Sequence, residues 1–187
     1  MKVLKFGGTS VGSVDSIRQI QHIIAQQTDD CIVVVSALGG ITDQLLKAAH
    51  LALEAGEEYM EVYQAIRCRH MDMVNTLITN PTTRQMLCLE LEGILDELRS
   101  ILFGVHLVKD LSDKTEAAIV SYGERMSSRI VTAALPGAVR KNSLQFIRTE
   151  HKQGQVLLNT ELTEQLIRHA FSPIPHLSVV PGFISRD

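Results

Sequence analysis

The segment 31–35 constrains the fold of this chain more than any other stretch of its sequence. It reads Cys-Ile-Val-Val-Val, a continuous apolar run. It lacks the alternation of polar and apolar residues that is typical of a strand with one solvent-exposed face. Such a run is typical of a strand buried on both sides within a parallel sheet. Apolar residues recur at helical spacing after Ser13 and again after Thr42. Strands that alternate with helices in this way predict an α/β fold, with a mostly parallel sheet covered on both faces.

The rest of the chain continues this alternation. Pro81 interrupts a long helical stretch, because proline ends one helix but is tolerated at the start of the next. We therefore interpret residues 57–103 as a helical hairpin inserted between two α/β units. The other expected strands are 3–6, 144–147 and 177–180, and the expected long helices cover about 57–79, 82–103, 113–135 and 160–171.

Composition excludes several classes of protein. The chain has 187 residues, of which 45% are hydrophobic and 21% charged, so it can bury a core and is not a disordered tail. The net charge is −3 and no long basic run is present, so nucleic acid is not an expected partner. No apolar stretch reaches the roughly 18–20 residues that a membrane helix needs, so no membrane contact is expected.

The cysteines and histidines form no recognisable metal or disulfide pattern. Cys31, Cys68 and Cys88 are odd in number, and their spacing fits neither a zinc site nor a disulfide framework. They predict reduced, mostly buried thiols in a cytoplasmic protein. None of the seven histidines stands at metal-ligand spacing to a cysteine, so no metal-binding residue is predicted.

The loop after the first strand is a candidate anion site. Ligands of parallel α/β sheets bind beyond the carboxyl ends of the strands. Gly7 and Gly8 let the backbone approach a ligand closely, and free N–H groups before a helix favour an anion such as phosphate. Lys5 adds a cation, and Ser10 lies in the same loop. Simple turn geometry explains the glycines equally well.

Two further segments leave two interpretations each open. Gly39 and Gly40 follow the buried strand, and Thr42 stands where the next helix begins, as its N-cap or as part of a binding site. Glu124 follows a glycine within a helical run and precedes Arg125. The two charges form either a surface pair, or Glu124 is a carboxylate that points into the crevice to hold an ammonium group.

Together these segments resemble a known family. Lys-Phe-Gly-Gly-Thr-Ser-Val at 5–11 is highly specific to the aspartate kinases of the amino acid kinase family. Residues 36–43 and 122–127 look like the second and third motifs of these enzymes, and 182–184 resemble the strand end that leads to their nucleotide lobe. The chain is most similar to the kinase part of bifunctional aspartokinase/homoserine dehydrogenases.

This resemblance implies a truncated three-layer α/β/α sandwich and a phosphoryl transfer from ATP to the side-chain carboxylate of L-aspartate. The product would be 4-phospho-L-aspartate, an intermediate for lysine, threonine and methionine. It implies that Lys5 is catalytic and neutralises charge on the transferred phosphoryl group, and that Mg²⁺ is bound through the nucleotide phosphates. Gly7 and Gly8 would offer backbone N–H groups to the phosphates, with Ser10 nearby.

The same resemblance assigns the amino acid substrate and the domain organisation. Thr42 and Glu124 would hold aspartate, Glu124 through the α-ammonium group. Residues 1–187 would form the N-terminal amino-acid-binding part of the kinase domain, because the family continues with a Gly-Arg-Gly-Gly-Ser-Asp-like segment, a nucleotide-binding half and regulatory domains. The parent protein is then expected to be a homo-oligomeric enzyme, and this chain alone to be inactive or nearly so.

Three other functions remain open at this stage. One is an assembly role, with the 57–103 hairpin as a partner surface. A related kinase of the same family could act on glutamate or on a nucleotide monophosphate. A small α/β domain could instead capture an anion without any chemistry. The choice among these depends on the groups that surround the glycine loops and Glu124.

Overall fold

The computed structural model describes residues 1–54, 56–152 and 155–186. Four parallel strands form the main sheet in the order β1-β2-β6-β3, and two further strands form an antiparallel hairpin. The strands are β1 (Lys2–Phe6), β2 (Cys31–Val35), β3 (Val139–Arg140), β4 (Thr149–Lys152), β5 (Gln155–Leu158) and β6 (Leu177–Pro181). The helices are α1 (Val14–Ala25), α2 (Ile41–Leu53), α3 (Glu58–Leu77), α4 (Pro81–Val108), α5 (Asp113–Ala134) and α6 (Thr160–Ala170).

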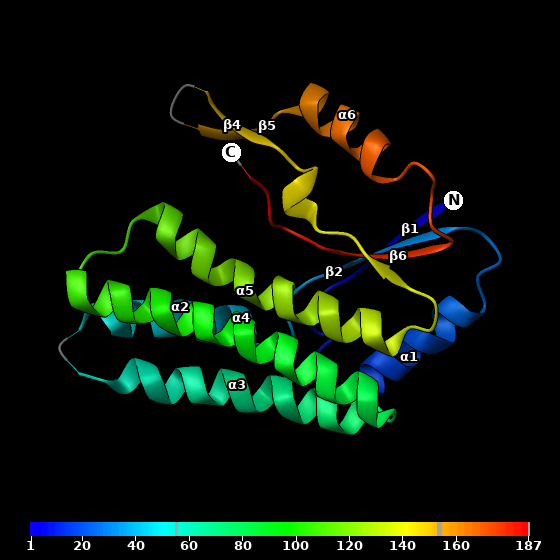
Figure 1. Cartoon of the computed structure of the whole chain (residues 1–187). Coiled ribbons are helices and arrows are strands. Elements are labelled where there is room, and N and C mark those ends of the chain that lie inside the picture. The colour runs from blue at the N-terminus through cyan, green and yellow to red at the C-terminus, as the bar shows by residue number, and fades with distance from the viewer. Residues whose placement is uncertain (55, 153–154, 187) are drawn as a thin grey trace.

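Helices cover both faces of the main sheet, as the alternating pattern predicts. In Figure 1, α6 lies above the sheet and α1 to α5 lie below it. The large core is on the lower side and includes the fully buried Val33 and Val179 of neighbouring strands. A smaller cluster lies under α6, where the rings of Phe146 and Phe171 meet edge to face at 5.5 Å.

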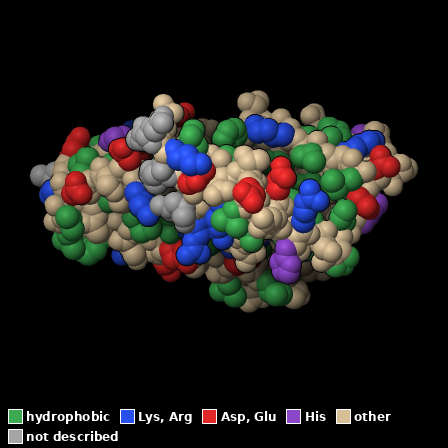
Figure 2. All heavy atoms as spheres, turned by 90° about the horizontal axis from the view of Figure 1, so that it is seen from above, with side chains coloured by type: hydrophobic (Ala, Val, Ile, Leu, Met, Phe, Trp, Pro, Cys, Tyr) green, Lys and Arg blue, Asp and Glu red, His purple; other side chains and the backbone are tan. Residues whose placement is uncertain are grey.

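The two faces of β2 differ in how well they are covered. Cys31, Val33 and Val35 are buried on the side of the large core, whereas Ile32 and Val34 on the α6 side are only half-buried. An open apolar hollow occupies that side and is lined by residues of β1, β2, β6 and α6. Figure 2 looks onto this side, where hydrophobic side chains lie among charged ones. Full burial of β2 on both faces is therefore wrong for the α6 side.

The helical hairpin forms as the proline predicts. Pro81 is the first residue of α4, and the side chain of Asn80 caps this helix by accepting a hydrogen bond from the Thr83 N–H at 3.0 Å. α4 runs to Val108, five residues beyond the expected end at 103. The two helices pack against α2 and α5, so the large core extends through these four helices as well as α1.

The expected strand at 144–147 is wrong. A short 3-10 helix covers Ser143–Gln145, and the N–H groups of Phe146 and Ile147 both donate to the carbonyl of Ser143. The strand that pairs with β6 comes earlier, at β3. Phe146 packs in the cluster under α6. An apolar residue buried in this way and an apolar residue in a buried strand give the same hydrophobic pattern in the sequence, so periodicity alone does not distinguish them.

The β4–β5 hairpin is not expected from the sequence pattern. The side chains of β5 are exposed and show no alternation of buried and exposed positions. The other late elements were correctly placed, because α6 and β6 lie within a residue of their expected bounds. Within the part of the chain that the structure describes, no helix is both long and apolar enough to cross a membrane.

Candidate functional site

The loops that follow β1 and β2 touch at the carboxyl edge of the sheet. A Cβ atom on Gly8 would lie 3.3 Å from the carbonyl oxygen of Ala37, and one on Gly39 would lie 3.2 Å from that of Gly8. Side chains at these two positions would therefore push the loops apart. By contrast, a Cβ on Gly7 would have no other atom within 4 Å. The close packing of the two loops explains why position 8 is glycine, but it does not explain the glycine at position 7.

The first loop also presents free backbone donors. In the described part of the chain, no N–H group from Gly7 to Ser10 donates a hydrogen bond, whereas the N–H groups of Val11 and Gly12 donate back to Gly7 and Thr9. α1 follows directly and is capped by Ser13, as the sequence predicts. Successive free N–H groups before a helix are a suitable environment for an anion.

Lys5 stands beside this loop on the α6 side of the sheet. The register pairs Lys5 with Val34 and Val34 with Val180, and paired residues of parallel strands point to the same face. The Lys5 Nζ lies 4.9 Å from the ring centroid of Phe183. No carboxylate among the described residues pairs with Lys5, so its ammonium group can meet an anion.

Glu124 of α5 is buried and faces the loop after β2. Its side chain is only 6% exposed, and its Oε1 accepts a hydrogen bond from the Ala37 N–H at 3.2 Å. Its Oε2 is buried and has no hydrogen-bond partner among the described residues. Burial raises the pKa of this carboxyl group, and the Ala37 N–H opposes the shift. A buried carboxylate oxygen without a partner suits a cationic ligand.

The interpretation of Glu124 and Arg125 as a surface pair is wrong. Arg125 pairs instead with Glu97 of α4 at 2.7 Å, and its guanidinium lies 4.2 Å from the ring centroid of Tyr122. The Arg125 guanidinium and Tyr122 both lower the pKa of the Glu97 carboxyl by hydrogen bonding, the former more strongly. Consecutive residues of a helix point in different directions, so the two charges serve different neighbours.

Two other residues of α5 fix the helix against the same loop. A Cβ on Gly123 would lie 2.6 Å from the Cβ of Ala37, so only glycine permits this approach. The Ser127 Oγ donates to the carbonyl of Ser36 at 2.7 Å. Sequence reasoning assigned no role to Ser127, although its position four residues after Gly123 places both on one helix face.

Thr42 is not the N-cap of α2. Gly40 takes that position with φ +80°, and the helix begins at Ile41. Thr42 is half-buried in the first helical turn. The structure thus gathers Gly8 and Glu124 around the loop after β2, while Lys5 lies on the α6 side of the sheet and Ser10 is exposed in the first loop. A ligand at the strand ends would therefore lie between Lys5 on the α6 side of the sheet and Glu124 on the α5 side.

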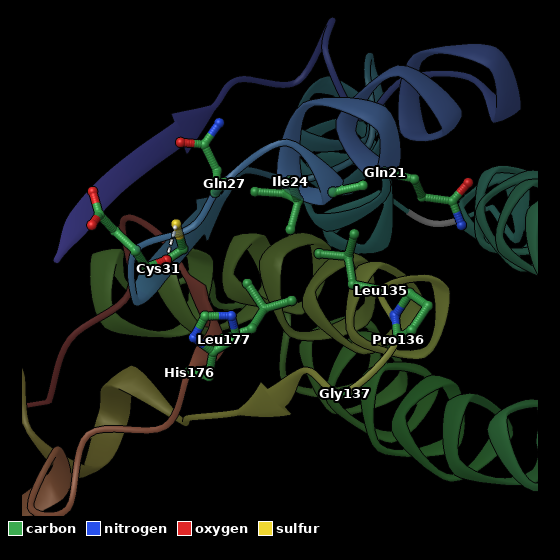
Figure 3. Close-up of a pocket in the computed structure, with 11 residues that line it drawn as sticks. Gln21, Ile24, Gln27, Cys31, Leu135, Pro136, Gly137, His176 and Leu177 are labelled. Carbon is green, nitrogen blue, oxygen red and sulfur yellow. Dashed lines mark hydrogen bonds between the residues drawn. The ribbon is translucent and has the colours of Figure 1, made fainter.

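A separate pocket of about 290 Å³ lies at the opposite end of the sheet. Figure 3 shows it between Gln21, Ile24, Cys31, Leu135 and His176, at the amino ends of β2 and β6. The Cys31 thiol donates to the Asp29 carbonyl at 3.3 Å. None of the candidate residues lines this pocket. Among the described residues, no group of three or more His, Cys, Asp or Glu side chains could hold a metal ion.

The relatives of this chain are kinases of amino acids. Aspartokinase 2, chloroplastic, of Arabidopsis thaliana is 32% identical over 137 residues, which cover 71% of this chain and 24% of the plant protein. The bifunctional aspartokinase/homoserine dehydrogenase 2 of Escherichia coli is 28% identical over 193 residues, covering 98% of this chain and 22% of that protein. The chain thus spans about a quarter of the length of these curated relatives.

The fold has a close counterpart among solved structures. E. coli aspartokinase III in complex with lysine and aspartate matches with a TM-score of 0.86 at 25% identity, over 99% of this chain and 41% of that one. The same enzyme in complex with aspartate and ADP matches with a TM-score of 0.84 at 24% identity, over the same shares of the two chains. The profile of the amino acid kinase family matches residues 1–187, and the chain belongs to this family.

Proposed function

We propose that this chain is the amino-acid-binding part of an aspartate kinase, which transfers the γ-phosphoryl group of ATP to the side-chain carboxylate of L-aspartate. The buried, half-satisfied carboxylate of Glu124 beside the loop after β2 is the observation that carries this proposal. The relatives are named aspartokinases, and a solved counterpart is described in complex with aspartate and ADP. The resemblance at 5–11, 36–43 and 122–127 points to the same reaction.

Glu124 would bind the α-ammonium group of aspartate through its free Oε2. An ammonium group supplies the donors that a buried carboxylate oxygen needs, and its positive charge would favour the ionised form of Glu124. Thr42, in the first turn of α2, would contact the same substrate. The close packing of Gly123 and the hydrogen bond of Ser127 hold α5 at the distance from the loop that this contact requires.

Lys5 and the first loop would hold the phosphates. The reacting carboxylate of aspartate has a reference pKa near 3.9, so it is ionised at pH 7 and needs no general base. The main obstacle is repulsion between two anions, which Lys5 and the free N–H groups of Gly7 and Gly8 would reduce, with Ser10 nearby. ATP supplies the phosphoryl group, with Mg²⁺ held by its phosphates, and no residue of this chain is assigned to the ion.

The assembly and location of the parent protein are also proposals. Residues 1–187 would supply one half of the kinase domain, and the adenine contacts and any regulatory domains would come from elsewhere in a longer protein. The parent would be a homo-oligomer in the cytoplasm. The location rests on the odd number of cysteines and their lack of a disulfide spacing. Of the three, only Cys31 is buried, while Cys68 is exposed and Cys88 half-buried, so the expectation of mostly buried thiols is wrong.

Replacing Glu124 by glutamine is expected to raise the KM for aspartate roughly 10- to 30-fold, because it removes the charge that faces the ammonium group. The KM is measured with a coupled assay of ADP release in the longest gene product that contains this chain. Glu97→Gln is the matched control, because it removes a carboxylate that pairs with Arg125 on the outside of the helices. An unchanged KM in the Glu124 variant would refute the ammonium contact.

The acceptor itself is tested in the same assay. Aspartate, glutamate and a nucleotide monophosphate are compared at equal concentration with Mg-ATP, and we expect turnover with aspartate only. Turnover with glutamate or the nucleotide would favour the related kinases. Calorimetric binding of phosphate compounds without turnover of any acceptor would favour an anion-binding module.

A further inference from the structure

Phe183 has an unusual conformation for a residue at a strand end. It is 83% exposed, although it follows the buried strand β6. Its φ of +55° lies in the left-handed region, which bulky residues rarely adopt. Such a conformation persists only where the surrounding structure imposes it, and it is found most often at functional sites. The outward position of this ring therefore needs an explanation.

The residues on both sides of Phe183 are fixed. The Gly182 N–H donates to the carbonyl of Val35 at 2.8 Å, and a Cβ on Gly182 would lie 3.1 Å from Cγ1 of Val34. On the other side, Ile184 is buried, and its carbonyl accepts a hydrogen bond from the Ser143 Oγ at 3.1 Å. With both neighbours anchored, the left-handed backbone turns the Phe183 side chain out of the core.

The ring that is turned outward lies against Lys5. The Nζ of Lys5 is 4.9 Å from the ring centroid, within the range of a cation–π interaction. Lys5 comes from the edge strand β1, while Phe183 follows β6, and β2 lies between these two strands. The contact therefore spans three strands at the carboxyl edge of the sheet, beside the free N–H groups of the first loop.

We propose that Phe183 is a positioning residue that holds the ammonium group of Lys5 at the strand ends, ready for the phosphates of a nucleotide. A lysine side chain in free solution samples many rotamers, and ordering it on binding lowers the affinity for the ligand. The aromatic ring restricts Lys5 before the ligand arrives and uses no hydrogen-bond acceptor, so the N–H groups that point away from the ring remain available to a phosphate. This inference rests on the proposed function and deepens it.

The test uses calorimetry to measure how tightly Phe183 variants bind inorganic pyrophosphate and Mg-ADP. The variants are made in the longest gene product that contains this chain, and the unsubstituted protein is called the parent chain. Phe183→Leu is expected to weaken binding about two- to fivefold, which is the effect of losing a solvent-exposed cation–π contact. Phe183→Tyr keeps an aromatic face and should restore the parent affinity. The control is Phe103→Leu, at a 51% exposed position on α4, which should bind like the parent chain.

A spectroscopic measurement separates positioning from a merely structural role. In lysine labelled with ¹³C, the ε-methylene protons of Lys5 should be shifted upfield by the ring in the parent chain and in Phe183→Tyr, and should lose this shift in Phe183→Leu. Lys5→Gln assigns the signal. An unshifted signal in the parent chain, or equal pyrophosphate affinity of parent and Phe183→Leu, would overturn the inference.

Lys5→Gln also distinguishes failure of this inference from failure of the proposed function. If this variant binds pyrophosphate as tightly as the unsubstituted protein, the phosphate role proposed for Lys5 is wrong, and the positioning by Phe183 is wrong with it. If Lys5→Gln weakens binding and Phe183→Leu does not, the phosphate role of Lys5 stands, and only the positioning by Phe183 is wrong.

Discussion

Replacing Gly123 by valine is expected to lower the free energy of unfolding by about 3 kcal/mol, the upper part of the usual range for overpacking. A Cβ at this position would lie 2.6 Å from the Cβ of Ala37, with side-chain atoms of Leu45 and Ile41 at 3.4 and 3.5 Å. The two methyl groups of valine have no free space among these neighbours. α5 must move away from the loop after β2, or the loop must shift. Urea unfolding followed by circular dichroism measures the loss.

Gly93→Ala is the matched control for this prediction. Gly93 also lies inside a helix, but a Cβ there would meet no atom outside its own helix backbone within 4 Å. Alanine stabilises a helix relative to glycine, so we expect the free energy of unfolding of this variant to exceed that of the unsubstituted chain by about 0.5–1 kcal/mol. If Gly123→Val is as harmless as Gly93→Ala, then α5 does not approach the loop as closely as the structure has it.

The elements that follow from local pattern were predicted well. The β-branched run of β2, the cap at Ser13 and the proline at the start of α4 each act within a few residues, so the sequence displays them directly. Gly123 inside α5 is different. A glycine costs about 1 kcal/mol in a helix relative to alanine, which indicates a constraint but not its partner. The structure shows that the partner is Ala37, in the loop after β2.

The features that depend on partners distant in sequence could not be predicted from pattern. Phe146 and Ile147 resemble strand residues, but they belong to the cluster with Phe171 and Val180. An irregular segment with a 3-10 turn is therefore enough to bury their side chains. The same limit applies to the site. Sequence resemblance selected Glu124, but its partner Ala37 is 87 positions away, and only the fold reveals that one oxygen is bonded and the other is not.

Acid is expected to destabilise this chain through His70, by about 3 kcal/mol between pH 6.5 and pH 4. The side chain of His70 in α3 is fully buried, and its Nδ1–H donates a hydrogen bond to the Ile66 carbonyl at 2.7 Å. Its Nε2 has no hydrogen-bond partner among the described residues. Burial lowers the pKa of His70 from 6.5 to about 4. One pKa unit corresponds to about 1.4 kcal/mol, so a pKa lowered from 6.5 to about 4 corresponds to about 3 kcal/mol.

The sign follows from proton uptake by the two states. Below pH 6.5 the unfolded chain binds a proton at His70 that the folded chain still excludes, so stability falls as the pH is lowered, and the loss levels off below about pH 4. Carboxyl groups titrate in the same range, so the measurement is the difference between the parent chain and His70→Leu. Leucine has a similar volume, cannot take up a proton and removes the unpaired Nε2, so at pH 8 this variant should be at least as stable as the parent. Urea unfolding at half-unit pH steps should then show the stability of the parent falling relative to that of the variant from pH 6.5 downward. Parallel pH profiles for the two chains would show that His70 is protonated or hydrated in the folded state, and that the α3 side of the core is more open than the structure has it.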